Sequence, residues 1–181
     1  MSGIRHIVRA EKFGWLLLLA GLLAACSHTA PQRPSQRMGE TPKGDSTQLA
    51  LMEMNQQLAL AADKQLTRLA QEQTEPYALY VSNTWIHILD RGDEDSFSPI
   101  PGEEWTVHMR IYDLEEHLLE DSEAAYHIGK QELPLAVEAN IEEWYHGTRA
   151  RMLVPWYAAF GMKGTDRIPP YENVIIEIEI R

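Results

Sequence analysis

Residues 154–181 read VPWYAAFGMKGTDRIPPYENVIIEIEIR, and this stretch decides the fold. It closes with apolar residues at every second position of 174–180, and Glu177 and Glu179 lie between the last of them, which predicts a strand with one apolar face and glutamates on the other. Two glycines and a Pro-Pro pair before it are typical of a loop. Because another apolar run occupies 149–154, we expect two strands joined by a long loop over 155–171.

The preceding sequence predicts further strands and one helix. We expect strands over 77–81, 85–89 and 104–113, and a short helix over 133–144. The strand segments are rich in aromatic and β-branched residues, and the third alternates apolar and polar positions. Within the helix, Val137, Ile141 and Trp144 are spaced to share one face. Several strands and one central helix predict an α+β domain in which a sheet folds over the helix.

The composition excludes several classes of function. Of the 181 residues, 16 are Lys or Arg and 27 are Asp or Glu, so the net charge is −11. An acidic chain repels phosphate, and we expect no nucleic-acid partner. A single cysteine excludes a disulfide-stapled scaffold and a Cys-rich metal site. The histidines have no short metal-ligand spacing, so we expect neither a metal nor another cofactor.

The acidic run over 113–123 is the one segment that suggests calcium. It lacks the glycine and the regular spacing of oxygen ligands found in a calcium loop. Three leucines interrupt the acidic residues, so we expect a solvated hairpin with the leucines facing inward.

The first 25 residues are typical of a secretory signal. Arg5, Arg9 and Lys12 precede an apolar run over 13–25, which is shorter than the about 20 residues that a membrane-spanning helix needs. The run ends in Leu-Ala-Ala-Cys26, which resembles the bacterial lipobox. This resemblance implies a lipoprotein signal peptide over 1–25, an acyl chain on Cys26 and a membrane-tethered mature protein on the periplasmic face of the outer membrane. The alternative is an ordinary A-x-A cleavage site with a chance cysteine.

A linker and a helix follow the lipobox. Residues 26–45 are rich in Pro, Gly, Ser and Gln and predict a flexible linker. Residues 46–75 predict an amphipathic helix, ended by Pro76. Its apolar stripe is thin and comprises Leu51, Met54, Leu58, Ala62, Leu66 and Leu69. Either its own domain covers this stripe, or a second copy does, in a homodimer through residues 46–73. A dedicated binding helix is the further alternative.

Several motifs occur in one fixed order over the second half of the chain. They are Gly-Lys-Gln-Glu at 129–132, the expected helix, Gly147, a strand, the 154–161 segment, Gly164 and Ile-Pro-Pro at 168–170. This set resembles the FKBP family of peptidyl-prolyl cis-trans isomerases over roughly 103–180. The lipobox, the spacer helix and the 77–89 segment are similar to gliding-motility-associated FKBP-like lipoproteins. The resemblance implies an FKBP-like domain over 76–181, with an antiparallel sheet curved around one short helix.

The resemblance also implies an activity. The X-Pro bond rotates over a barrier of ~18–20 kcal/mol because amide resonance is lost in the twisted state. A dry apolar pocket favours the twisted amide, which has less charge separation than the planar one. The implied function is isomerisation of X-Pro bonds in exported, proline-containing polypeptides, without a cofactor.

The family's site residues carry over to positions that have often changed. Phe160 stands at the flap tyrosine, Val137 at the helix tryptophan, Glu120 at an aspartate, and Ile168 keeps its isoleucine; these are the catalytic candidates. The substrate-binding candidates are Met109, Leu119, Leu133, Pro134, Ile176, Trp156 and Tyr157. Pro134 falls where the family offers a backbone N–H, and it has none. We therefore expect a pocket that is apolar, wider and short of donors, and a weak isomerase.

Two alternatives remain open at this stage. The replaced aromatic and donor groups equally fit a non-catalytic FKBP-like binding or assembly module of the cell envelope. Trp156 and Tyr157 are expected either to pack within the loop or to form an exposed aromatic pair that contacts an unfolded client.

Overall fold

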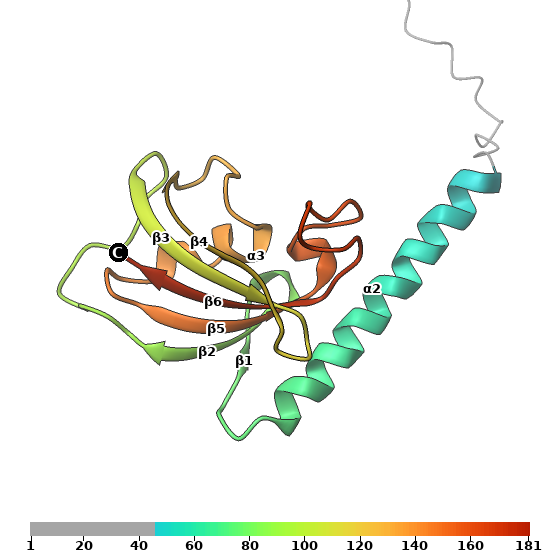
Figure 1. Cartoon of the computed structure of the whole chain (residues 1–181), viewed down its shortest axis with the longest axis horizontal. Coiled ribbons are helices and arrows are strands. Elements are labelled where there is room, and N and C mark those ends of the chain that lie inside the picture. The colour runs from blue at the N-terminus through green and yellow to red at the C-terminus, as the bar shows by residue number, and fades with distance from the viewer. Residues whose placement is uncertain (1–45) are drawn as a thin grey trace, which may run out of the picture. The chain divides into compact units, whose positions relative to one another are not determined.

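A computed structural model of the chain describes residues 46–181. The predicted signal peptide over 1–25, the lipidation at Cys26 and the linker over 26–45 lie outside the described residues. The long helix comes first, followed by a domain made of six strands and one short helix (Figure 1). The elements are α2 (Ser46–Glu72), β1 (Ala78–Leu79), β2 (Trp85–Asp90), β3 (Glu104–Tyr112), β4 (Leu118–His127), α3 (Leu135–Glu138), β5 (Arg149–Val154) and β6 (Val174–Ile180).

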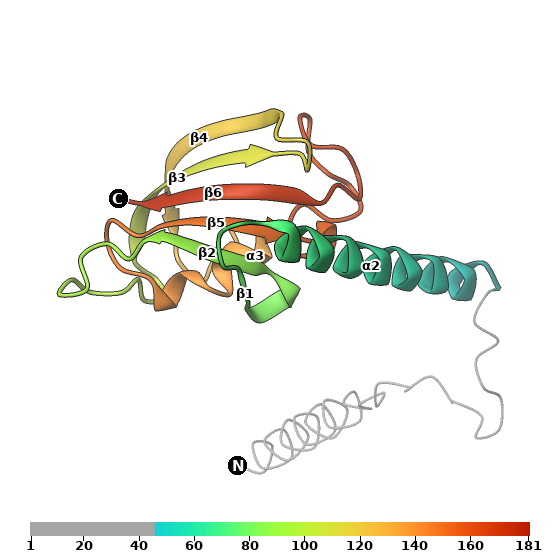
Figure 2. The same cartoon turned by 90° about the horizontal axis from the view of Figure 1, so that it is seen from below.

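All six strands form one antiparallel sheet in the order β1-β2-β5-β6-β3-β4. The last strand, β6, lies in the middle, between β5 and β3 (Figure 2). The strands curve around α3 on one side of the sheet (Figures 1 and 2). The expected α+β architecture, an antiparallel sheet around one short helix with an amphipathic helix before it, is confirmed.

The main core lies between the sheet and α3. Alternation along β3 and β6 turns every second residue inward, and Val107, Met109 and Ile111 are all buried. Val137, Ile141 and Trp144 are buried as well, which confirms their predicted common face.

The helix that carries these three residues is shorter than expected. It contains one turn of α-helix, α3, and a 3₁₀ turn over Ile141–Glu143. The side chain of Asn140 explains the break, because its amide donates to the carbonyl of Ala136 at 2.7 Å and so replaces the next backbone donor of a continuing helix.

The opposite face of the sheet is covered in part by α2. Leu66 and Ala70 of the helix pack on Leu153 of β5 and Ile175 of β6. The central strand β6 is therefore buried on both faces. Only the C-terminal half of the predicted apolar stripe packs on the sheet. In the N-terminal half, Leu51, Met54 and Leu58 are exposed. No helix in the part of the chain that is described is both long and apolar enough to cross a membrane.

The structure corrects the strand expected over 77–81. Strand β1 is limited to two residues, and a 3₁₀ turn over Val81–Asn83 follows. Ser82 and Asn83 have φ values of 61° and 54°, and the N–H of Tyr80 donates to the carbonyl of Thr84 at 2.8 Å. The chain reverses here to enter β2.

The acidic run forms the predicted solvated hairpin between β3 and β4 and differs from its prediction in one leucine. Asp113 accepts the backbone N–H groups of Glu115 and His117 and so forms a tight turn, after which the ten-residue strand β4 begins. Leu118 is exposed rather than inward. Most residues of β4 lie at the surface, because it is an edge strand, and its sequence therefore lacks the apolar alternation that predicts strands.

Candidate functional site

The long loop between β5 and β6, residues 155–173, forms a compact flap. It opens with a 3₁₀ turn over Trp156–Ala158. The N–H of Tyr171 then donates to the carbonyl of Gly161 at 3.1 Å, which closes the loop on itself. Gly164 has a φ of 65°, and a Cβ there would overlap the carbonyl oxygen of Ile168. The glycine thus fixes the place of Ile168.

Eight of the eleven predicted site residues belong to the main core between the sheet and α3 or pack against it, Tyr157 among them. We call the other seven the flap cluster; they are Met109 of β3, Leu119 of β4, Leu133, Val137 of α3, Phe160 and Ile168 of the flap, and Ile176 of β6. Five of them expose 5% or less of their surface, and only Leu119 and Phe160 are partly exposed.

The flap cluster is closed, where a wider pocket was expected. Its aliphatic side chains pack against one another, as protein interiors do when no rigid ring holds the walls apart. Three hollows found in residues 46–181 are lined by none of its seven members. Because five of these members expose 5% or less of their surface, a prolyl ring reaches them only if the flap, which carries Phe160 and Ile168, moves.

A β-bulge brings Glu120 toward this site. Glu120 lies directly opposite Ile111, whereas the next pair joins Tyr112 to Leu118, so that Leu119 is the extra residue. Residues directly opposite in an antiparallel pair share a face of the sheet, and Ile111 is buried in the core. Glu120 is thus a half-buried carboxyl group on the inner face, next to Leu119 of the flap cluster.

The position before α3 offers no hydrogen-bond donor. Pro134 is the residue immediately before the helix, and its carbonyl accepts the N–H groups of Val137 and Glu138 at 2.9 and 3.0 Å. The nearest preceding amide, that of Leu133, donates to the Glu138 carboxylate. At this point Pro134 itself has no backbone N–H, and that of Leu133 is already bonded.

The flap aromatics do not form an exposed pair. Trp156 is buried, with its ring centroid 4.8 Å from that of Tyr171 and 5.5 Å from that of Tyr157. Of the two alternatives, packing within the loop is the one that holds for Trp156, because the flap turns the indole inward. Its N–H has no hydrogen-bond partner among the described residues, an arrangement that typically costs about 1–3 kcal/mol.

Tyr157 is half-buried and bound to other parts of the chain. Its hydroxyl donates to the carboxylate of Asp63 on α2 and accepts from the side-chain amide of Asn83 at 3.1 Å. Burial and the hydrogen bond to Asp63 raise the pKa of Tyr157 to about 12. These contacts already use the one proton that its hydroxyl can donate.

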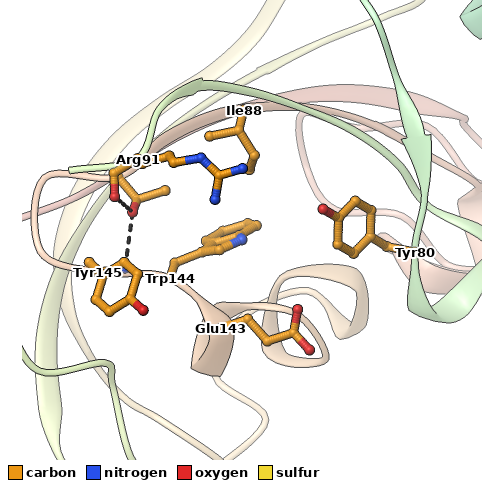
Figure 3. A pocket seen from close by; sticks show the side chains of 7 residues that line it. Tyr80, Ile88, Arg91, Glu143, Trp144 and Tyr145 are labelled. Atoms are coloured by element: carbon orange, nitrogen blue, oxygen red, sulfur yellow. Dashed lines mark hydrogen bonds between the residues drawn. The ribbon is translucent and has the colours of Figure 1, made fainter. Parts of the chain in front are cut away.

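The structure also contains a hollow that the sequence did not predict (Figure 3). This Trp144 hollow has a volume of about 110 Å³ and is lined by Tyr80, Ile88, Arg91, Glu143, Trp144, Tyr145 and Thr148. Thr148 shapes one side, since its hydroxyl donates to the carbonyl of Arg91 at 2.8 Å and accepts the N–H of Tyr145 at 3.0 Å. The signal that could have indicated it is the Glu-Trp-Tyr run after the helix.

The Trp144 hollow is small and charged. Small-molecule sites typically have about 300–1,000 Å³. In Figure 3 the guanidinium of Arg91 points toward the indole of Trp144, whereas the carboxylate of Glu143 points away from it. The lining thus combines two charged groups with three aromatic rings and Ile88. Across residues 46–181, no group of three His, Cys, Asp or Glu side chains is placed to hold a metal ion.

Comparison with known proteins defines the fold. A peptidyl-prolyl cis-trans isomerase from Pseudomonas syringae is similar over 68% of this chain and 92% of that one, with a TM-score of 0.57 and 16% identity. The N-terminal domain of FKBP42 from Arabidopsis thaliana is similar over 60% of this chain and 92% of that one, with a TM-score of 0.50 and 21% identity. This chain has the FKBP fold. No family model and no curated protein matches the sequence.

The structural similarity establishes the FKBP fold. At 16% and 21% sequence identity it does not establish the activity, which has to be tested. The expected resemblance to FKBP-type structures is confirmed, whereas the narrower one to gliding-motility-associated lipoproteins stays a prediction. Within the FKBP fold, the flap, α3 and the inner faces of β3 and β6 meet at the flap cluster. This cluster is the candidate functional site.

Proposed function

We propose that the chain is a weak peptidyl-prolyl cis-trans isomerase that acts at the flap cluster. The observation that carries the proposal is the FKBP fold combined with an apolar cluster in which seven predicted site residues meet. A prolyl ring would enter between Phe160 and Ile168 on the flap side and Val137 on the helix side. Met109, Leu133 and Ile176 would supply the remaining apolar contacts.

The chemistry requires no proton transfer. The cluster is dry, so it favours the twisted X-Pro amide over the more polar planar form. Glu120 would lie at its edge beside Leu119. The site lacks a tyrosine hydroxyl at Phe160 and a backbone N–H at Pro134, and each missing hydrogen bond typically costs about 0.5–1.5 kcal/mol. The aromatic ring lost at Val137 costs about as much again. At about 1.4 kcal/mol per factor of ten, these three losses together remove about one to three powers of ten in rate.

The test is the rate of cis-trans exchange in a short Ala-Pro peptide, followed by NMR exchange spectroscopy with the full chain added. The proposal predicts exchange faster than the thermal rate, and a loss of this acceleration in Ile168→Ala. A rate equal to the thermal one at equimolar protein would overturn the catalytic claim.

A second function, binding without turnover, is favoured by one observation. The five most buried residues of the flap cluster expose 5% or less of their surface and belong to the main core. A non-catalytic module of the cell envelope would then hold a partner through another surface. Partner binding that survives Phe160→Ala but is lost on deletion of α2 would favour this function over isomerisation.

The cellular setting is part of the proposal. The Leu-Ala-Ala-Cys26 motif supports acylation at Cys26, a tether to the periplasmic face of the outer membrane and exported polypeptides as clients. Mass spectrometry of the mature N-terminus tests it, and an unmodified cysteine would contradict it. The exposed Leu51, Met54 and Leu58 support a homodimer through residues 46–73. A monomeric mass on size-exclusion chromatography would contradict the dimer.

A further inference from the structure

Helix α2 does more than cover the sheet, because it also binds the flap directly. Three of its side chains, those of Asn55, Asp63 and Gln65, make hydrogen bonds to flap residues. At 1.5 Å per residue these positions span about 15 Å of helix. The contacts reach the beginning, the middle and the end of the flap.

Asp63 makes the contact at the beginning of the flap. One carboxylate oxygen accepts the hydroxyl of Tyr157, and the other accepts the side-chain amide of Asn83 at 3.3 Å. Asn83 also donates to the Tyr157 hydroxyl, so that three residues from separate segments form a closed set of hydrogen bonds. A hydrogen bond to a charged group is stronger than one between neutral groups.

Asn55 binds the middle of the flap and its return. Its side-chain amide N–H lies 3.3 Å from the sulfur of Met162, and its carbonyl oxygen accepts the hydroxyl of Tyr171 at 3.1 Å. Tyr171 packs on the buried Trp156. One helical residue thus connects both arms of the flap.

Gln65 completes the set near β6. Its side-chain oxygen accepts the amide of Asn173 at 3.0 Å, and Asn173 in turn accepts the backbone N–H of Trp156 at 2.9 Å. The first and last residues of the flap are therefore joined to each other and to α2.

The helix is held in place independently of the flap. Leu66 and Ala70 are anchored on Leu153 and Ile175 of the sheet, in an apolar contact separate from the flap cluster. The polar residues of α2 bind the flap from this fixed support, and the flap carries Phe160 and Ile168 over the candidate site.

We propose that α2 is a clasp that holds the flap closed over the flap cluster, with Asp63 as its main contact and Asn55 as the second. The predicted effect on catalysis rests on the proposed function. The clasp itself, the contact between α2 and the flap, does not depend on that function. Release of α2 from the flap would let Phe160 and Ile168 move away from Val137 and admit a peptide. The raised pKa of Tyr157 agrees with a hydroxyl held in this contact.

The test uses Asp63→Ala and Asn55→Ala in the full chain, with Lys64→Ala as the matched control. Alanine is the best helix former, so the substitutions do not weaken α2 itself. Lys64 is an exposed neighbour on the same helix. Hydrogen exchange is measured at the bonded flap amides of Gly161, Thr165 and Tyr171, and at the amides of β5 and β6 as a reference for global unfolding.

The clasp predicts about tenfold or faster exchange at the three flap amides in Asp63→Ala, a smaller increase in Asn55→Ala, and none in Lys64→Ala, relative to the strand amides. It also predicts a threefold or greater rise in kcat/KM for a proline peptide. Unchanged flap exchange, equal acceleration in the strands, or a fall in kcat/KM would overturn the clasp. Faster flap exchange with no isomerase activity in any variant would support the clasp and refute the proposed function.

Discussion

The flap cluster and the Trp144 hollow lie in the same domain and share one segment, yet they differ in nearly every property. Residues 133–148 contribute Leu133 and Val137 to the cluster and Trp144 to the hollow. All but one of the seven side chains of the cluster are non-aromatic, and five are buried, whereas the hollow is lined by three aromatic rings together with the exposed Arg91 and Glu143. The comparison shows that the visible cavity and the site expected from the sequence are different places.

The difference has a physical cause. Aliphatic side chains at the positions of the family's aromatic residues pack together, so the site closes when no ligand is present. In the lining of the hollow, Arg91 and Glu143 are both exposed. Openness therefore says little about which of the two binds a prolyl ring.

The largest expected effect is a loss of stability at the flap cluster. Ile168→Ala removes a fully buried side chain and should lower the free energy of unfolding by about 2–5 kcal/mol, as measured in urea. Leu135→Ala, an exposed position on α3, is the control and should change it by less than about 0.5 kcal/mol. Equal effects at the two positions would show that the cluster is not the closed core described.

The contact between the flap and α2 should produce the next largest effect. Tyr157→Phe removes only the hydroxyl and should cost about 1–3 kcal/mol at neutral pH. In the wild-type protein the folded state keeps the phenolic proton to about pH 12, above the usual tyrosine pKa of about 10. The contribution is therefore fully present below pH 10 and is lost as the pH rises through 12.

Stability measured against pH checks this sign. Tyr157→Phe should lack the part of the alkaline decline that belongs to this residue. Identical alkaline curves for the wild type and the variant would contradict the hydrogen bond to Asp63.

A smaller effect is expected from restoring a hydroxyl to the flap. Phe160→Tyr adds one donor at the edge of the flap cluster and should raise kcat/KM about two- to tenfold, equivalent to about 0.5–1.5 kcal/mol. Phe97→Tyr makes the same change at an exposed loop residue and serves as the control. A rise in kcat/KM in both variants, or in neither, would show that Phe160 is not part of the functional site.

The smallest effect is expected at the hollow. Arg91→Ala should leave kcat/KM within twofold and stability within about 0.5 kcal/mol, since Arg91 is exposed and its nearest acid, Glu94, lies 3.9 Å away. A large loss of isomerase activity in Arg91→Ala would show that the active site is the Trp144 hollow and not the flap cluster.

The sequence predicted those strands and helices in which apolar residues recur at a regular spacing. Alternation in β3 and β6, the run in β5 and the long helical pattern of α2 all correspond to observed elements. Edge strand β4 was missed because both its faces are polar over much of its length. The helix predicted over 133–144 is longer than the observed one, because Asn140 ends α3 through a side-chain hydrogen bond. The spacing of apolar residues does not reveal such a bond.

The sequence predicted which residues make up the site, but it did not predict that the site is closed. Motif order placed Met109, Val137 and Ile168 in one region, where the structure also has them. Closure of the cluster depends on how side-chain volumes fill space, and the roles of Trp156 and Tyr157 depend on contacts with α2, about 90 residues earlier in the sequence. Such long-range contacts leave no local pattern in the chain.

One measurement tests the central claim that the flap cluster accommodates a prolyl ring. A short peptide with a single proline is titrated into the full chain while NMR follows the methyl groups of Met109, Ile168 and Ile176, and the same peptide with alanine in place of proline is the control. The account predicts shifts at these three residues with the proline peptide and not with the alanine peptide. Shifts confined to residues of the Trp144 hollow, or equal shifts with both peptides, would contradict it.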